Sequence, residues 1–440
     1  MEFESFDTKI LSLGEARIPS PVCKAGGITE DYFISENDRV LINVNSHNLY
    51  EFLKEGKEVP SFETAGPRNK IYFDPSKVKC ALVTCGGLCP GLNDIIRAIV
   101  LELYHRYGVR NIYGIRYGLQ GFIPKYGHDV MELASHSVEN ILNMGGSILG
   151  SSRGAQNIDE VVDCLERMNI GILFMIGGDG TLMAAKKIAD TILKRNIRVS
   201  VVGIPKTIDN DIYLVARSFG FDTAVDVATQ SIKGAHNEAE SYPNGIGLIK
   251  LMGRYSGFIA TTAVLAQQEV NFVLIPEVDF DLEGSDGLLA KLEKRLKQRS
   301  HAVIVVAEGA GQKFFKSGDD EVDASGNIIL KDIGFFLKNK ITEYFQNRGI
   351  EISLKYIDPS YMIRSLPANA NDSVFCGFLG RDAVHAGMAG KTKLIISNWN
   401  NHFVHVPIDI SAGKRKQVNP NGKLWRTVLE STGQGSLKAD

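Results

Sequence analysis

Residues 170–181 read Ile-Gly-Ile-Leu-Phe-Met-Ile-Gly-Gly-Asp-Gly-Thr and join an apolar run to a glycine-rich turn. The run Ile170–Ile176 has the length and composition of a buried strand, and a helical pattern follows over Thr181–Arg195. A strand that passes through glycines into a helix predicts one unit of a parallel sheet, because parallel strands need a helical crossover. Asp179 in the turn is either a helix cap or, beside bound phosphates, an oxygen ligand for Mg²⁺, and we favour phosphate and metal binding.

The same alternation of apolar runs and helical patterns extends from Val78 to Ser397 and predicts an α/β fold. Strands are expected at Val78–Thr84, Asn111–Ile115, Ile170–Ile176, Val199–Ile204, Gly245–Leu251, Phe272–Ile275, Ala302–Ala307, Ile352–Ile357 and Lys393–Ser397. Helices are expected at Asn93–Tyr107, Thr181–Arg195, Leu288–Arg299, Asp332–Asn347 and Asp372–Ala389. Because so many strands exceed the roughly five or six of a typical sheet, we expect two doubly wound, Rossmann-like lobes with mostly parallel sheets. Residues 1–75, which show no sustained period, are interpreted as an N-terminal extension, and residues 416–440 as a C-terminal tail.

The overall composition excludes several classes of protein. The 440 residues include 49 Lys and Arg against 51 Asp and Glu, a formal net charge of −2. General nucleic-acid binders and proteins drawn to anionic membranes usually carry a basic excess. The N-terminus lacks the basic start and apolar core of a signal peptide, and no stretch approaches the roughly 20 apolar residues of a membrane span. We therefore expect a cytoplasmic protein with no nucleic-acid or membrane partner.

Two more loops whose residues could take part in binding or catalysis follow predicted strands. Gly86, Gly87 and Gly91 lie in the turn Thr84–Asn93, where bare backbone N–H groups at a helix start can approach a phosphate. This turn has neither the dinucleotide glycine spacing nor the lysine of a P-loop, and a tight turn without a ligand is the alternative. The third loop, Pro205–Asp211, places Asp209 and Asp211 at the carboxyl end of a strand, where one carboxylate could accept a proton from a hydroxyl. A capped turn is the alternative there.

Two later motifs are Met252-Gly253-Arg254 and Tyr361-Met362-Ile363-Arg364. Taken together with the three loops, they resemble the 6-phosphofructokinase family. The motifs occur in the family's order over most of the chain from Val78, and they resemble its trypanosomal, plant and spirochaete ATP-dependent branch, which is allied to pyrophosphate-dependent enzymes. The loop Gly177–Thr181 alone also resembles NAD kinases and diacylglycerol-type lipid kinases, but such kinases leave the other motifs unexplained. A non-catalytic sugar-phosphate-binding subunit is a further alternative, against which the retained Asp179, Thr207, Asp209 and Arg153 argue.

The resemblance implies roles for individual residues. In the donor-nucleotide lobe, expected at residues 76–220 and 365–415, it implies Mg²⁺ on Asp179 and Arg153 close to the transferred phosphoryl group. Asp209 would take the proton of the C1 hydroxyl of fructose 6-phosphate, with Thr207 and Asp211 positioning the reacting groups. The phosphoryl donor would also contact Gly86, Gly154, Gly178, Gly180 and Thr181. The sugar-phosphate lobe, expected at residues 221–364, would supply Met252, Gly253, Arg254, Glu308, Tyr361, Met362, Ile363 and Arg364, with Ile208 and Thr207 also near the sugar. The resemblance further implies a homodimer or homotetramer.

Two residues give opposite indications of the phosphoryl donor. Pyrophosphate enzymes of the family carry Asp at position 180, which would crowd the α-phosphate of ATP, whereas Gly180 leaves room for it. Lys206 is the residue that pyrophosphate users place in the third motif. We give Gly180 more weight, because a lysine tolerates either polyphosphate, and we expect Mg-ATP as donor with pyrophosphate as the alternative.

The chain departs from the family's bacterial allosteric pattern at three positions. Gly245 and Lys355 stand where that pattern has arginines, and Tyr361 replaces a histidine. Because glycine has no side chain and lysine lacks the bidentate fork of arginine, the cross-subunit phosphate pocket and the usual effector response are not implied by the resemblance.

Overall fold

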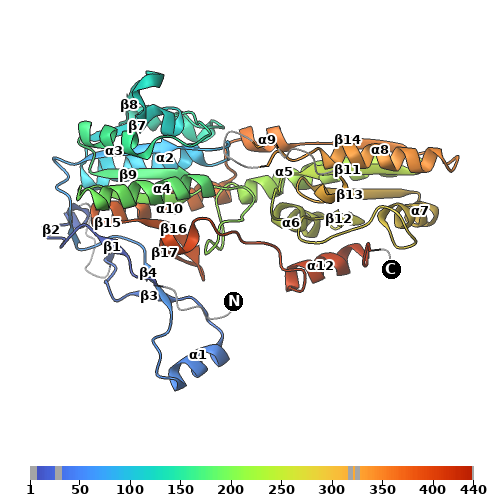
Figure 1. Ribbon diagram of the computed structural model, residues 1–440, viewed down its shortest axis with the longest axis horizontal. Helices are drawn as coiled ribbons and strands as arrows, with labels where there is room; N and C mark the ends of the chain where they lie inside the picture. The colour runs from blue at the N-terminus through green and yellow to red at the C-terminus, as the bar shows by residue number, and fades with distance from the viewer. Residues whose placement is uncertain (1–6, 25–31, 316–320, 323–327, 439–440) are drawn as a thin grey trace. The chain divides into compact units, whose positions relative to one another are not determined.

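The computed structural model describes residues 7–24, 32–315, 321–322 and 328–438 and divides into two compact units (Figure 1). Unit 1 takes its described residues from Met1–Thr207, Ile212–Gly220 and Leu366–Arg415. Unit 2 takes them from Ile208–Asp211, Phe221–Ser365 and Lys416–Asp440. The third loop of the sequence is therefore shared, since Thr207 belongs to unit 1 and Asp209 to unit 2.

Unit 1 is built on a sheet of nine strands, counted over the described residues. The central strands from β16 to β7 are parallel, while β17, β4 and β3 add antiparallel strands at one edge and β8 at the other. In spatial order the strands are β3 (Arg39–Leu41), β4 (Ser61–Thr64), β17 (His402–Pro407), β16 (Leu394–Trp399), β10 (Ser200–Pro205), β9 (Ile172–Gly177), β6 (Lys79–Thr84), β7 (Asn111–Ile115) and β8 (Val130–Glu132). The α-helices of this unit are α1 (Ser46–Lys54), α2 (Leu92–Leu101), α3 (Ile158–Arg167), α4 (Asp179–Lys194), α10 (Ala370–Met388) and α11 (Ile408–Ser411).

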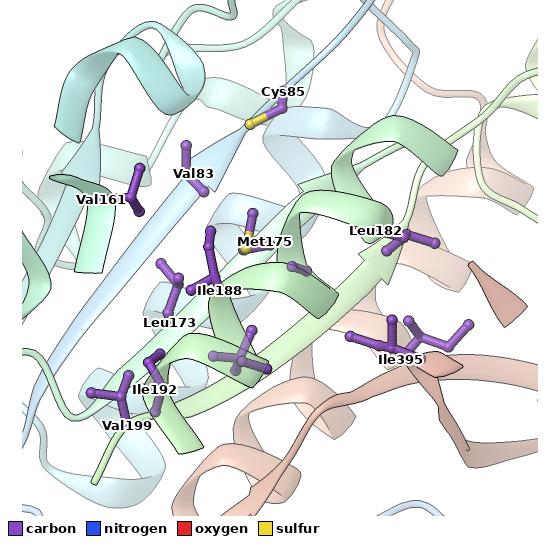
Figure 2. Packing of buried hydrophobic residues seen from close by; sticks show 14 of the residues in the cluster. Val83, Cys85, Val161, Leu173, Met175, Leu182, Ile188, Ile192, Val199 and Ile395 are labelled. Carbon is purple, nitrogen blue, oxygen red and sulfur yellow. The ribbon is translucent and has the colours of Figure 1, made fainter. Parts of the chain in front are cut away.

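Alternate side chains of β9 pack against helices on opposite faces of this sheet. Leu173 and Met175 belong to an apolar cluster with side chains of α3 and α4 (Figure 2). On the other face, Gly387 of α10 lies against Ile172 and Phe174, and a Cβ at that glycine would come within 2.8 Å of the isoleucine Cγ2. Because β9 and α4 are held in one core, the turn between them has a fixed position.

The strand order reverses at β6, with β7 beside it on one side and β9 on the other. In doubly wound sheets, ligands bind outside the carboxyl ends of the strands at such a switch point. The loops that follow β6 and β9 lie at this point, and the loop after β10 follows the next strand. The three loops selected from the sequence thus begin at the carboxyl ends of the neighbouring parallel strands β6, β9 and β10.

The N-terminal residues, expected as an extension, contribute strands to unit 1. β1 (Leu11–Ser12) pairs with β15 (Lys391–Thr392), and β2 (Ile18–Pro19) pairs with β5 (Lys70–Ile71). β4 pairs with β17, so segments from the two ends of the chain lie side by side (Figure 1).

A buried ionic cluster joins these distant segments. The carboxylate of Glu63 in β4 accepts hydrogen bonds from Arg68 Nη2 at 2.8 Å and His405 Nδ1 at 3.0 Å, and Lys391 Nζ lies 3.3 Å away. Burial alone would raise the pKa of Glu63, but the hydrogen bond and charge of His405, with Lys391 and Arg68, hold it well below its usual range. Glu63 is therefore buried as a carboxylate that its basic neighbours stabilise.

Unit 2 is built on four parallel strands among its described residues. Apolar side chains of α7 and α8 pack together against one face of this sheet. In spatial order the strands are β12 (Phe272–Leu274), β13 (His301–Ala307), β11 (Gly245–Leu251) and β14 (Ser353–Ile357). The α-helices are α5 (Phe221–Glu240), α6 (Phe258–Gln267), α7 (Leu288–Arg299), α8 (Ile333–Gln346), α9 (Ser360–Ser365) and α12 (Lys423–Thr432).

Helix α5 packs unusually close to β11. A Cβ at Gly245 would lie 2.0 Å from Ala239 O, and one at Gly247 would lie 2.9 Å from Ala235 O. Both contacts involve backbone oxygen, so neither position accepts a side chain while α5 packs in this way. The structure therefore gives a physical reason for glycine at position 245, where the bacterial pattern has an arginine.

The predicted α/β class with mostly parallel sheets is confirmed, and one predicted helix needs correction. The helix expected over Asn93–Tyr107 is α-helical only to Leu101 and continues as a π-helix over Glu102–Tyr107. Leu103 and Tyr107 are buried in the π-helix, and their spacing of four residues is also that of an α-helical face, so the apolar pattern does not distinguish the two. The residues expected as a C-terminal tail pack within unit 2, where the backbone N–H of Val273 donates to Gln434 Oε1 at 2.7 Å.

Candidate active site

Lys206 connects the two glycine loops of unit 1, which we define as residues 84–93 and 177–181. Its ammonium donates to Gly87 O at 2.7 Å in the first loop, and its backbone N–H donates to Gly177 O at 2.9 Å in the second. The side chain is only 7% exposed. Lys206 therefore holds the two loops at a fixed separation and adds a buried positive charge beneath them.

Arg153 and Gly154 lie beside the first glycine loop. Ser151 Oγ donates to Gly86 O at 2.6 Å, and Gly86 N–H donates to Ser152 O at 3.2 Å. Arg153 is exposed, and its Nη2 lies 3.6 Å from where a Cβ at Gly87 would stand. The predicted donor residues Gly86, Arg153 and Gly154 are therefore neighbours, although they come from segments about 70 residues apart in the sequence.

The second glycine loop leaves open space above the start of α4. A Cβ at Gly180 would meet no described atom within 4 Å, whereas one at Gly177 would lie 2.2 Å from Thr181 Oγ1. Gly178 stands at the N-cap, and its helix has Asp179 as its first residue. Helix N-termini present free N–H groups and a partial positive charge. The space at Gly180 can thus receive an anion, while Gly177 serves close packing.

Asp179 contacts a segment that the sequence analysis did not select. Its Oδ1 accepts a hydrogen bond from Gly413 N–H at 2.7 Å, and its Oδ2 lies 3.9 Å from Arg415 Nη2. In the described part of the chain, no group of three or more His, Cys, Asp or Glu side chains is placed to share a metal ion. A cation at Asp179 would accordingly need further oxygens from its ligand.

The basic segment Gly413-Lys414-Arg415-Lys416 also supplies a contact in unit 2. Lys416 N–H donates to Asp211 O at 2.7 Å, and burial lowers the pKa of the Lys416 ammonium to about 8 although the charge of Asp211 opposes that shift. The run of three cations was visible in the sequence, but nothing local linked it to the glycine loops. Its role follows from contacts between residues more than 200 positions apart.

Asp209, in unit 2, is the residue that the resemblance implies as the proton acceptor. Burial, with the negative charges of Asp211 and Glu308, raises the pKa of Asp209 to about 7. The charge of Arg364 and a hydrogen bond from the Arg254 backbone N–H oppose this rise. A carboxyl group with a pKa near neutral pH is suited to accept a proton in catalysis.

Two glycines allow the loops around Asp209 to approach each other. Gly253 has φ +129°, and a Cβ there would lie 2.4 Å from Ser256 O. A Cβ at Gly309 would lie 1.9 Å from Arg254 O. The ends of β11 and β13 are thereby joined, and Gly309 N–H donates to Gly253 O at 3.1 Å. Glu308 follows β13 directly, and Arg254 lies three residues after the end of β11.

Part of the last motif, Tyr361–Arg364, lies against the motif Met252–Arg254. Arg364 Nε lies 3.2 Å from Met252 Sδ, whereas Tyr361 is 82% exposed and Met362 is 66% exposed. Ile363 and Met252 are buried in the core of unit 2, and Ile208 is nearly so. Side-chain contacts with a sugar are therefore open to Tyr361, Met362 and Arg364, while the buried apolar residues position the backbone. In unit 1, Thr207 O accepts a hydrogen bond from Ser218 Oγ at 2.6 Å.

Comparison with protein families identifies the chain over residues 79–387, which match the family described as phosphofructokinase. The chain belongs to the phosphofructokinase family. Within it, the chain is 52% identical to an ATP-dependent 6-phosphofructokinase of Borreliella burgdorferi, over 98% of this chain and 97% of that protein. It is 46% identical to an enzyme of the same name from Amycolatopsis methanolica, over 97% of this chain and 95% of that protein. The family prediction is therefore confirmed against the NAD-kinase and lipid-kinase alternatives.

Solved structures of the family share the fold. The pyrophosphate-dependent phosphofructokinase of Marinobacter aquaeolei superposes with a TM-score of 0.66 at 19% identity, covering 82% of this chain and 92% of that one. Phosphofructokinase of Pichia pastoris in the T-state gives a TM-score of 0.63 at 21% identity, covering 82% of this chain and 37% of that one. At these identities the likeness concerns the fold alone. Over the described residues, no helix has the length and apolar character to cross a membrane.

Proposed function

We propose that this chain is an ATP-dependent 6-phosphofructokinase. It transfers the γ-phosphoryl group of Mg-ATP to the C1 hydroxyl of fructose 6-phosphate and forms fructose 1,6-bisphosphate and ADP. The substrates come from the names of relatives that match nearly the whole chain. The observation that carries the assignment is Asp209, a carboxyl group whose pKa is raised to about 7 beside Arg254, Glu308 and Arg364.

In the proposed reaction, Asp209 accepts the proton of the C1 hydroxyl. The C1 oxygen forms a bond to the γ-phosphorus as the bond from that phosphorus to the bridging oxygen of ADP breaks. Arg153 neutralises charge on the transferred phosphoryl oxygens, and Thr207 and Asp211 position the reacting groups. Catalysis rests on positioning and charge, because phosphoryl transfer of this kind needs no covalent intermediate on the protein.

The donor side of the reaction is assigned to unit 1. Gly86, Gly154, Gly178, Gly180 and Thr181 contact the nucleotide phosphates, and the open space at Gly180 admits the α-phosphate of ATP. The pyrophosphate alternative finds no support among the curated relatives, which are named ATP-dependent. Lys206 interacts with either polyphosphate and does not decide between them.

Asp179 is the residue assigned to Mg²⁺. Magnesium in kinases is usually held by one or two carboxylates together with phosphate oxygens. Asp179 fits this pattern, since it is a single carboxylate at the start of α4, and only its Oδ1 accepts the close bond from Gly413. When bound, the metal neutralises charge on the phosphates.

The acceptor side is assigned to unit 2. Arg254 and Arg364 supply cations for the sugar phosphate, and Glu308 accepts hydrogen bonds from sugar hydroxyls. Tyr361 and Met362 present exposed side chains, while Gly253, Met252, Ile208 and Ile363 contribute through the backbone they position. The chain is further proposed to act in the cytoplasm. It is proposed to form a homodimer or homotetramer, and light scattering on the purified protein measures this oligomeric state.

A coupled assay that detects fructose 1,6-bisphosphate tests the proposed function. ATP and pyrophosphate are supplied separately at equal concentration, with Mg²⁺ and fructose 6-phosphate present in each case. We expect turnover with ATP and little with pyrophosphate. A higher rate with pyrophosphate would overturn the donor assignment, and no turnover with either donor would revive the non-catalytic alternative.

A further inference from the structure

We propose that Arg415 is a phosphoryl-donor contact and acts with Asp179 on the nucleotide phosphates. This inference rests on the proposed function and extends the donor site beyond the family motifs found in the sequence. It concerns residues of unit 1 only. We define the strap as Ser411–Arg415, the segment that starts at the last residue of helix α11.

The strap lies directly against the start of α4. Gly413 adopts φ +81°, a conformation that favours glycine, and its N–H donates to Asp179 Oδ1 at 2.7 Å. Two residues further on, Arg415 Nη2 lies 3.9 Å from Asp179 Oδ2. The guanidinium is therefore placed beside the carboxylate assigned to Mg²⁺ and near the helix N-terminus assigned to the phosphates.

The strap keeps its position through contacts that do not use the Arg415 side chain. Ser411 Oγ donates to Tyr213 O at 2.7 Å, and the Lys414 ammonium lies 5.4 Å from the centre of the Tyr213 ring. The backbone of Arg415 forms an antiparallel bridge with Ile212. Replacing only the Arg415 side chain should accordingly leave the strap in place.

The guanidinium of Arg415 is accessible and only loosely held by Asp179. Its side chain is 33% exposed, and the 3.9 Å separation exceeds the roughly 2.7–2.9 Å of a charge-assisted hydrogen bond. Lys206, by contrast, donates to Gly87 O at 2.7 Å and is buried. A polyphosphate at the glycine loops can therefore be met by two exposed guanidinium groups, Arg153 and Arg415, whose planar forks suit phosphate oxygens.

Binding of Mg-ADP, measured by calorimetry, tests this contact without relying on turnover. We expect Arg415→Gln to weaken Mg-ADP binding by about tenfold, the scale of one charge-assisted contact. The KM for ATP should rise by a similar factor, while the KM for fructose 6-phosphate stays unchanged. The matched control is Lys187→Met, which removes a positive charge from the exposed side of α4 and should bind Mg-ADP as the wild type does.

The outcomes separate this inference from the proposed function. Wild-type affinity for Mg-ADP in Arg415→Gln would overturn the role of Arg415 while leaving the kinase assignment intact, whereas a wild-type chain that neither binds Mg-ADP nor phosphorylates the sugar would overturn the proposed function itself. An equal loss of affinity in Lys187→Met would also overturn the contact, since it would reflect net charge alone. Should Arg415→Gln fail to fold, Arg415→Lys provides the comparison: an affinity below that of the wild type supports a forked contact, and an unchanged affinity contradicts it.

Discussion

Glycines near the candidate sites of the two units differ in what surrounds them. At Gly180 in unit 1, a Cβ would enter space free of described atoms, whereas at Gly253 and Gly309 in unit 2 it would collide with backbone oxygen. The first glycine leaves room for a ligand, and the other two leave room for the protein's own loops. A glycine-rich motif therefore does not by itself indicate a ligand; the surroundings of each glycine decide its role.

The charged residues assigned to the two sites also differ. The proposed donor site of unit 1 relies on the cations Arg153, Lys206 and Arg415. Unit 2 places Asp209 close to Asp211 and Glu308, so that its pKa rises. In the proposed reaction, unit 1 neutralises the charge of the donor, and unit 2 supplies the group that takes the proton.

The largest effect is expected from removing the base in unit 2. Asp209→Asn should lower kcat by about 10²- to 10⁴-fold, the usual contribution of a general base. Mg-ADP binding by unit 1 should be unchanged in calorimetry, and circular dichroism should show an intact fold. Asp226→Asn, on the exposed side of α5, is the control and should retain full activity. A near-normal rate in Asp209→Asn would remove Asp209 from the mechanism.

The next effect comes from filling the open glycine of unit 1. Gly180→Asp should lower kcat/KM for ATP by about tenfold or more, because a carboxylate in that space repels the donor phosphates. The KM for fructose 6-phosphate should stay constant in the same steady-state measurements. Gly180→Ala adds a Cβ without charge and separates steric from electrostatic effects. An unchanged ATP rate in Gly180→Asp would show that the space at residue 180 is not used by the donor.

A smaller effect, on stability, is expected from the closed glycine of unit 2. Gly253→Ala should cost about 1–3 kcal/mol, because its φ of +129° and its contact with Ser256 O both oppose a side chain. Differential scanning calorimetry should show a lower unfolding temperature. Gly180→Ala, the same substitution in open space, should not lower it. Equal behaviour of the two variants would contradict the distinction between open and closed glycines.

The smallest effect is a shift in pH dependence. Asp209 acts as a base only when deprotonated, so kcat/KM for fructose 6-phosphate should fall as the pH drops through about 7. Asp211→Asn removes a negative charge that raises the pKa of Asp209, and the acidic limb of the profile should therefore move to lower pH. Asp226→Asn should leave the limb in place. A limb that is unaffected by Asp211→Asn would mean that another group controls it.

The sequence was sufficient to predict most of the parallel strands, because a buried parallel strand is a continuous apolar run bounded by turns. The antiparallel strands β4 and β17 were not predicted, since their place in the sheet depends on pairing between the two ends of the chain. The candidate loops were found because each follows an apolar strand. Arg415 was missed because its link to Asp179 exists only in three dimensions. The burial of Ile363 was not predicted either, because it lies in a short motif beside Tyr361 and Met362, which are exposed.

The pairing of β4 with β17 bears on how the chain folds as it leaves the ribosome. Glu63 and its hydrogen-bond partner His405 are 342 positions apart, so β4 cannot join the sheet until nearly the whole chain has been synthesised. Until then, a strand edge and the buried charges of Glu63 and Arg68 lack their final surroundings, which is the condition under which nascent chains associate wrongly. Strands β1 and β4 are thus made early but reach their final partners, β15 and β17, late.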